Sequence, residues 1–297
     1  MSDRPADPLK YVLIMPTRDE EKYLQATLDA ITEQTVLPAE LIVVNDGSKD
    51  RTGEIAEAAA AKYPWIHVVH RADRGERKVG GGVVDTFYSG HEKLKTPDYA
   101  FVCKMDGDVT FRPTYFEDLL KKFAADPKLG GASGKTFNPV GDVLHEERLI
   151  DEMVAGQMNF WRRECFEQIG GLVREVMWDG INFHRARMFG WKTASFRDEE
   201  LVILHHRLMG SSHKGVLHGR LRWGRGQWFM GTHPLYIIAS GIFRMRERPY
   251  VIGGLCIVAG YFRAWMQGER RYDDPQFRKH LHRWQLGRLG LGFLSPK

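Results

Sequence analysis

Short apolar runs that alternate with helical patterns constrain the fold of this chain most strongly. Residues 11–15 form the first run, and a polar loop and a stretch with apolar residues at Leu24, Leu28 and Ile31 follow it. Similar apolar runs occur at 41–44, 66–69 and 99–103. Continuous apolar strands that alternate with helices are typical of a mostly parallel sheet flanked by helices on both faces. We therefore predict an α/β domain over residues 8–230.

Polar loops follow three of these strands at the point where each strand ends. These loops contain Thr17 to Glu20, Asp46, and Asp106 to Asp108. In open α/β sheets, ligands bind beyond the carboxyl ends of the strands. We expect the three loops to line one crevice.

Asp106-Gly107-Asp108 places two carboxylates at the end of the apolar run 99–103. Side chains two residues apart in an extended segment point to the same side, and glycine between them allows a ligand to approach closely. Carboxylate oxygens suit Mg²⁺ or Mn²⁺, which share the rest of their coordination shell with phosphates. The alternative is ordinary turn chemistry that closes a strand.

Three motifs together resemble the N-terminal signatures of family 2 glycosyltransferases with the GT-A fold. They are Pro16-Thr17-Arg18-Asp19-Glu20, Val44-Asn45-Asp46-Gly47-Ser48 and Asp106-Gly107-Asp108. The similarity covers roughly residues 10–200. It implies a nucleotide-sugar donor, a divalent cation and an inverting transfer. The Gln-x-x-Arg-Trp motif of processive synthases is absent, and this argues against a polymerase.

The resemblance also assigns donor residues. Thr17, Glu20 and Asp46 match positions that hold the nucleoside in this family, and Lys78 lies where a basic residue near the donor is often found. Asp106 and Asp108 match the pair that binds the metal and the donor. Asp108 is the expected direct metal ligand.

Asp179 falls where the family's Glu-Asp pair supplies the general base, although Trp178 precedes it here. A carboxylate on the face of the sugar opposite the leaving group would take the proton from the acceptor hydroxyl. The alternative role for Asp179 is the N-cap of the helix that follows.

Two histidines and several arginines extend the set of candidates. His205 or His206 would complete the metal site, as a histidine does in some GT-A enzymes. Neighbours on a strand point to opposite faces, so at most one of the two would coordinate. Arg222 and Arg225 would clamp the diphosphate of the donor, or of a lipid acceptor, through bidentate contacts. Their alternative role is a solvated basic face.

The C-terminal third of the chain is basic and contains the most hydrophobic stretches. From residue 201 onward there are 16 Lys and Arg against 4 Asp and Glu. The apolar stretches 235–243 and 250–262 are both shorter than the roughly 20 residues that a spanning helix needs. Flanking arginines and tryptophans favour attachment of residues 235–263 to an anionic membrane surface. The alternative for the whole segment 231–297 is helices that pack in a core or a dimer.

Cysteine usage and the N-terminal sequence predict the compartment. Cys103, Cys165 and Cys256 lack Cys-x-x-Cys spacing, which is typical of reduced cytosolic thiols. The N-terminus has no apolar core of a secretory signal. We expect a cytoplasmic protein at the inner face of the cell membrane.

Two other functions stay open at the level of sequence. A sugar-phosphate nucleotidyltransferase would share the α/β layout, but it needs a loop rich in glycine and arginine after the first strand. A non-catalytic protein that binds nucleic acid or another anionic partner would use the basic C-terminus, but no recognition motif is present. We predict transfer of one sugar to a hydroxyl of a glycan or lipid-linked glycan, in cell-surface polysaccharide or glycolipid synthesis, with no nucleic-acid partner.

Overall fold

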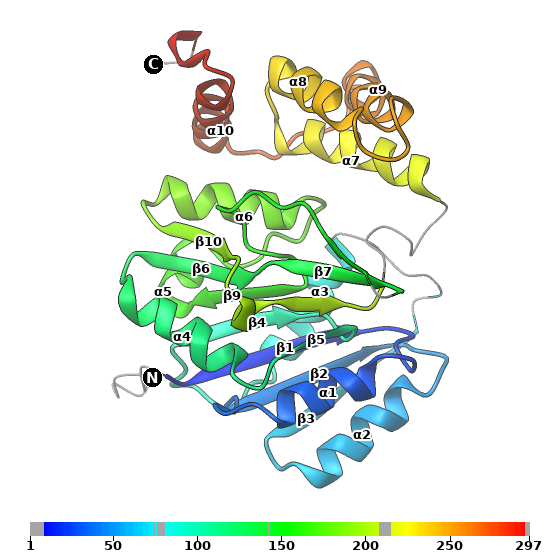
Figure 1. The fold of residues 1–297 in the computed structure, drawn as a ribbon, viewed down its shortest axis with the longest axis vertical. Helices are drawn as coiled ribbons and strands as arrows, with labels where there is room; N and C mark the ends of the chain where they lie inside the picture. Colours follow the sequence, from blue (N-terminus) through cyan, green and yellow to red (C-terminus); the bar gives the residue numbers. More distant parts are fainter. Residues whose placement is uncertain (1–8, 74, 76–80, 142, 208–214, 295–297) are drawn as a thin grey trace. The chain divides into compact units, whose positions relative to one another are not determined.

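The chain forms two compact units, Met1–Arg207 and Leu208–Lys297. The computed structural model describes residues 9–73, 75, 81–141, 143–207 and 215–294 (Figure 1). The domain boundary predicted from the sequence is residue 230, whereas the structure divides the chain after Arg207. Helix α7 (Val216–Met230) lies in the second unit because it packs along α9 (Ile252–Met266) of that unit.

A seven-stranded sheet forms the centre of the first unit. Its strand order is β10-β6-β9-β4-β1-β2-β3, and only the pairs of β9 with β4 and β6 are antiparallel (Figure 1). The strands are β1 (Tyr11–Thr17), β2 (Glu40–Asp46), β3 (Ile66–Arg71), β4 (Phe101–Met105), β6 (Leu129–Gly134), β9 (Met158–Arg162) and β10 (Lys192–Phe196). The predicted mostly parallel sheet is confirmed.

Helices cover both faces of this sheet. They are α1 (Leu24–Thr32), α2 (Thr52–Lys62), α3 (Gly81–His91), α4 (Tyr115–Ala125), α5 (Arg163–Gln168) and α6 (Trp178–Met188). Leu13 belongs to the same buried cluster as Leu28 of α1, whereas its neighbour Ile14 belongs to the opposite cluster with Phe87 of α3. Successive side chains of a strand point to opposite faces, so a strand between two helical layers must be apolar at every position.

A second sheet of four strands brings distant segments together beside the Asp-Gly-Asp motif. Its order is β5-β11-β7-β8, formed by β5 (Val109–Phe111), β11 (Ile203–His205), β7 (Thr136–Val140) and β8 (Val143–Glu146). A short 3₁₀ helix, η1 (Glu199–Leu201), precedes β11. In the antiparallel pairing of β5 and β11, His205 lies opposite Val109. The end of β11 therefore lies next to Asp108.

The second unit is helical. It contains α7, α8 (Pro234–Arg244), α9, α10 (Pro275–Arg288) and the 3₁₀ helix η2 (Gly292–Leu294). Helices α7 and α9 meet at glycines, because a Cβ atom at Gly224 would lie 1.9 Å from the carbonyl oxygen of Ile257. A Cβ atom at Gly260 would likewise lie 2.2 Å from the carbonyl oxygen of Leu221.

The two apolar stretches of the C-terminal segment are the helices α8 and α9, of 11 and 15 residues. Within the described residues, no helix has both the length and the apolar character needed to cross a membrane. Contact with a membrane surface stays a prediction. Cys103, Cys165 and Cys256 are free thiols.

Candidate active site

Gly107 brings the Asp-Gly-Asp motif against the loop that follows β1. A Cβ atom at Gly107 would lie 2.9 Å from Cγ2 of Thr17 and 3.7 Å from Cγ of Glu20. Real Cβ atoms are not found as close as the first distance, so only glycine allows this approach. Two of the three loops expected to line one crevice therefore meet at this point.

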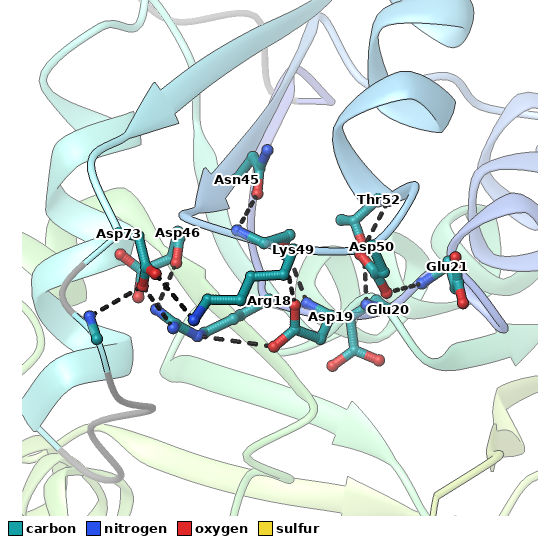
Figure 2. A network of polar contacts seen from close by, with 12 residues as sticks. Arg18, Asp19, Glu20, Glu21, Asn45, Asp46, Lys49, Asp50, Thr52 and Asp73 are labelled. Atoms are coloured by element: carbon teal, nitrogen blue, oxygen red, sulfur yellow. Dashed lines mark hydrogen bonds and ion pairs between the residues drawn. The ribbon is translucent and has the colours of Figure 1, made fainter.

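A network of side-chain to backbone hydrogen bonds joins the loop after β1 to the loop after β2 (Figure 2). The amide of Lys49 donates to Oδ1 of Asp19 at 2.9 Å, and the amide of Glu20 donates to the hydroxyl of Thr52 at 2.7 Å. Asp19 adopts a left-handed conformation with φ of 54°, which aspartate tolerates better than most residues. The loop after β1 is thus held by the start of α2.

Asp46 lies at the end of β2, with its carboxylate in an ion pair. Nη1 of Arg71 donates to Oδ1 of Asp46 at 2.9 Å and to the hydroxyl of Thr86 at 2.7 Å. Nη1 of Arg18 donates to the backbone oxygen of Asp46 at 2.8 Å. Both the side chain and the backbone of Asp46 are therefore fixed.

Arg18 also forms an ion pair with Asp73 at 2.7 Å (Figure 2). Hydrogen bonds from the Arg18 guanidinium and from the amide of Gly75 lower the pKa of Asp73 to about 2. Arg18 thus links the ends of β1, β2 and β3.

Asp106 and Asp108 have different partners. The ammonium group of Lys104, whose side chain is 4% exposed, forms an ion pair with Oδ1 of Asp106 and donates to the carbonyl oxygen of Gly156 at 2.9 Å. The side chain of Asp106 is 30% exposed, whereas that of Asp108 is 8% exposed. Asp106 is therefore the carboxylate more open to solvent.

Asp108 is surrounded by cationic groups. Its carboxylate lies 3.6 Å from Nε2 of His205 and 3.5 Å from Nε of Arg207, and Arg207 also forms an ion pair with Glu20. Burial favours the neutral carboxyl group, but these neighbours outweigh it and lower the pKa of Asp108. Arg207 thus connects Asp108 to Glu20.

His205 is buried between two carboxylates. Nδ1 of His205 lies 2.7 Å from Oε1 of Glu147, on the side of the ring opposite Asp108. Burial alone would lower the pKa of this imidazole, but the hydrogen bonds and charges of Asp108 and Glu147 raise it to about 10.

His206 faces other groups. Its Nε2 lies 2.8 Å from the hydroxyl of Thr110, and its ring stacks on Tyr23 with centroids 5.9 Å apart. Burial lowers the pKa of His206. Of the two histidines, His205 is the one whose ring nitrogen faces Asp108.

The chemistry of these side chains fits a divalent cation. Among the described residues, no group of three or more His, Cys, Asp and Glu side chains has the arrangement of a complete metal site. Asp108 and His205 nevertheless offer an oxygen and a nitrogen on one side, and Asp106 offers a more exposed carboxylate. Mg²⁺ in nucleotide enzymes is commonly held by one or two carboxylates together with substrate phosphates.

Asp179 lies in the first turn of α6, where it is partly exposed. The helix N-cap is Met177, which makes no side-chain capping bond, so Asp179 does not occupy the N-cap position that the alternative role required. Desolvation raises the pKa of Asp179, and the charge of Lys104 opposes this shift. A Cβ atom at Gly156 would lie 3.9 Å from Oδ2 of Asp179. Because Lys104 donates to Gly156, Asp179 lies close to the Lys104 and Asp106 pair.

Three predicted donor residues lie outside the described part of the first unit. Lys78 lies outside the described residues. Arg222 and Arg225 lie on α7 of the second unit, where Nε of Arg225 forms an ion pair with Glu269 at 2.5 Å. Their assignment to a diphosphate stays a prediction.

Four residues of the cluster were not identified from the sequence. They are Arg71, Lys104, Glu147 and Arg207. A lysine inside an otherwise apolar strand was a signal for Lys104, because a buried charge requires a partner. Nothing in the local sequence marks the other three, whose partners lie far away along the chain.

Solved structures of GT-A glycosyltransferases share this fold. A mannosyltransferase from Pyrobaculum calidifontis, in complex with GDP-Man and Mn²⁺, aligns over 99% of this chain and 91% of its own, with a TM-score of 0.53 and 14% identity. TarS from S. aureus, in complex with UDP-GlcNAc, aligns over 97% of this chain and 82% of its own, with a TM-score of 0.54 and 14% identity. The fold is therefore that of the GT-A glycosyltransferases.

Sequence comparison identifies the family. The model of glycosyl transferase family 2 matches residues 12–179, and the chain belongs to this family. Undecaprenyl-phosphate mannosyltransferase of Micrococcus luteus is 31% identical over 113 residues, which are 38% of this chain and 44% of that protein. The uncharacterized glycosyltransferase EpsJ of Bacillus subtilis is 40% identical over 110 residues, 37% of this chain and 29% of that protein. The chain thus spans less than half the length of either relative. Both the family and the fold favour a glycosyltransferase over the two other functions that the sequence left open.

Proposed function

We propose that this enzyme moves one sugar from a nucleotide-sugar donor to a hydroxyl of a glycan or lipid-linked glycan, in cell-surface polysaccharide or glycolipid synthesis. The observation that carries the proposal is the approach of Gly107 to Thr17 and Glu20, which joins the Asp-Gly-Asp motif to the loop after β1. The sugar nucleotides bound by the two structural neighbours support the donor class. The name of the Micrococcus luteus relative supports a lipid-linked acceptor.

In this proposal the ends of β1 and β2 bind the nucleoside. Asp46 offers a carboxylate that accepts hydrogen bonds from N–H groups of a base, and Arg71 fixes its orientation. Thr17 and Glu20 form the neighbouring wall. Lys78, Arg222 and Arg225 are the candidate cations for the diphosphate.

Asp106, Asp108 and His205 would hold a divalent cation, Mg²⁺ or Mn²⁺. When bound, such a cation acts as a Lewis acid that offsets negative charge on the leaving diphosphate. Arg207 lies beside Asp108 and Glu20, and its guanidinium is suited to bidentate contact with phosphate oxygens.

Asp179 is the proposed general base. The acceptor oxygen attacks the anomeric carbon and its proton passes to the Asp179 carboxylate, while the bond from that carbon to the diphosphate oxygen breaks. The nucleoside diphosphate leaves with the bonding electrons. Attack from the face opposite the leaving group inverts the anomeric configuration.

The second unit would bring the enzyme to the inner face of the cell membrane. Ile242 and Phe243 of α8 are 59% and 57% exposed, and Arg244 follows them directly. Ile252 and Leu255 of α9 are 54% and 52% exposed. Exposed apolar side chains next to arginines favour binding to anionic lipid at an interface.

Thermal unfolding of the protein with a panel of UDP-, GDP-, dTDP- and CMP-sugars, each with and without Mn²⁺ or Mg²⁺, tests the proposal. A ligand that binds only the folded state stabilises it by about 2.7 kcal/mol at a hundredfold excess over the dissociation constant. We expect one nucleotide class to raise the melting temperature, and to do so more strongly with the cation. No shift with any donor would contradict the proposed donor site.

A further inference from the structure

Glu147 contacts His205 on the side of the imidazole ring that faces away from Asp108. It follows β8 and is buried, and its Oε1 lies 2.7 Å from Nδ1 of His205. An ionised carboxylate accepts hydrogen bonds but cannot donate them, so Nδ1 must carry the proton. Nε2 lies 3.6 Å from Oδ1 of Asp108, and a cation bound there would take the place of the proton on Nε2 while Nδ1 keeps the proton that Glu147 accepts.

The separation of these two atoms suits a shared cation. Two ligand atoms on bonds of about 2.1 Å lie about 3.0 Å apart at the right angle of an octahedral site. Nε2 of His205 and Oδ1 of Asp108 lie 3.6 Å apart, so the two atoms would have to close by only about 0.6 Å to bind one ion. Glu147 is on the far side of the imidazole and does not compete for that place.

The second oxygen of Glu147 is also fixed. Nε2 of Gln157 donates to Oε2 of Glu147 at 2.7 Å, and the carbonyl oxygen of Gln157 accepts from the amide of Asp106 at 2.9 Å. Hydrogen bonds thus run from the backbone of Asp106 through Gln157 and Glu147 to His205. Because Nε2 of His205 faces Asp108, this series of contacts begins at Asp106 and ends at Asp108.

We propose that Glu147 is a positioning residue for the metal site, which fixes the tautomer and the ring orientation of His205 so that Nε2 faces a cation held by Asp108. This inference rests on the metal dependence proposed above. A carboxylate that accepts the other N–H of a coordinating histidine also raises the basicity of that ligand, and its loss typically costs 10- to 100-fold in metal affinity.

Binding of Mn²⁺, alone and with UDP or GDP, tests the inference without any measurement of activity. The electron paramagnetic resonance signal of free Mn²⁺ gives the dissociation constant, and pulsed measurements detect a nitrogen nucleus coupled to bound Mn²⁺. We expect nitrogen coupling in the wild type. In Glu147→Ala we expect a dissociation constant raised about 10- to 100-fold and a loss of the coupling.

Glu147→Gln is the conservative variant. Its amide oxygen still accepts from Nδ1 of His205, so we expect the nitrogen coupling to be retained. The amide carries no charge, so we expect the dissociation constant for Mn²⁺ to rise about tenfold, at the low end of the range for loss of a residue that hydrogen-bonds to a metal ligand. If Glu147→Ala does not fold, Glu147→Gln alone tests the positioning role of Glu147. Glu146→Ala is the matched control, because Glu146 is the adjacent residue and pairs with Arg197 at 2.8 Å instead. We expect it to bind Mn²⁺ as the wild type does.

Wild-type affinity and coupling in Glu147→Ala, or an unchanged dissociation constant in Glu147→Gln, would overturn the role of Glu147. A bound Mn²⁺ without nitrogen coupling in the wild type would also overturn it. Failure of the wild type to bind Mn²⁺ under any of these conditions would instead contradict the proposed metal dependence.

Discussion

The ammonium group of Lys104 forms an ion pair with the carboxylate of Asp106 at the end of β4. The same group lies 5.5 Å from the centre of the ring of Trp178, the residue before Asp179. One buried lysine therefore connects the Asp-Gly-Asp motif to the proposed general base. This connection makes the charge of Lys104 relevant both to the stability of the site and to the protonation of Asp179.

Replacement of Lys104 by methionine removes that charge at similar length. Because Asp106 keeps access to water, we expect a loss of about 1–3 kcal/mol in the free energy of unfolding. The charge of Lys104 lowers the pKa of Asp179, so its removal should raise that pKa and move the acid limb of kcat/KM to higher pH. Lys121→Met removes an exposed lysine of α4 and is the control. An unchanged pH profile in Lys104→Met would contradict this coupling.

Asp179→Asn tests the general base. General base catalysis contributes about 10²- to 10⁴-fold, and we expect a loss of kcat in that range with donor binding retained. Burial raises the pKa of Asp179 in the wild type, and only the ionised carboxylate accepts a proton. The activity of the wild type should therefore fall with decreasing pH at a higher pH than an ordinary aspartate would give. Turnover of Asp179→Asn at the wild-type rate would remove the assigned role.

Four strands of the seven-stranded sheet, β1, β2, β3 and β4, were predictable because they carry strong local signals. The runs 11–15, 41–44 and 66–69 lie within β1, β2 and β3, and the helical pattern of Leu24, Leu28 and Ile31 lies within α1. The run 99–103 is offset by two residues from β4 (Phe101–Met105). Burial on both faces demands apolar residues throughout such strands, so the pattern is visible in the sequence.

The second sheet and the partners of Asp108 were not predictable in the same way. Strands β5 and β11 have three residues each, too few for a periodic pattern, and they pair across nearly a hundred residues of sequence. His205 was a candidate by its residue type, but the contact with Glu147 spans 58 positions. Only the folded chain shows which of the two adjacent histidines faces Asp108.

Asp46→Ala tests the nucleoside site. The variant loses the acceptor for the base and leaves Arg71 without its carboxylate partner, and an unsatisfied group of this kind costs about 1–3 kcal/mol. We expect the donor dissociation constant to rise about 10- to 100-fold in isothermal titration calorimetry. Asp98→Ala is the control. Asp98 precedes β4 and forms an ion pair with Lys10, which precedes β1. Equal donor affinity in Asp46→Ala and Asp98→Ala would refute the assignment of Asp46.

The membrane proposal is testable with lipid vesicles. We expect the protein to sediment with vesicles that contain phosphatidylglycerol and less with purely zwitterionic vesicles, because its arginines are attracted to anionic headgroups. Ile242→Glu with Phe243→Glu should reduce sedimentation several-fold, since both exposed apolar side chains are replaced by like-charged groups. Leu37→Glu, at an exposed leucine of the first unit, should have no effect. Equal sedimentation of all three proteins would count against α8 as the attachment site.

The most direct test of the central claim is the product that the enzyme releases from a nucleotide sugar. Each donor of the panel is incubated with Mn²⁺ and a set of oligosaccharide and polyprenyl-phosphate acceptors, and the nucleotide products are separated by ion-exchange chromatography. We predict release of a nucleoside diphosphate from one donor class, reduced at least about a hundredfold by a chelator or by Asp108→Asn, because charge on the leaving diphosphate is then not offset. Release that is unaffected by both the chelator and Asp108→Asn, or no release from any donor, would contradict metal-dependent sugar transfer at this site.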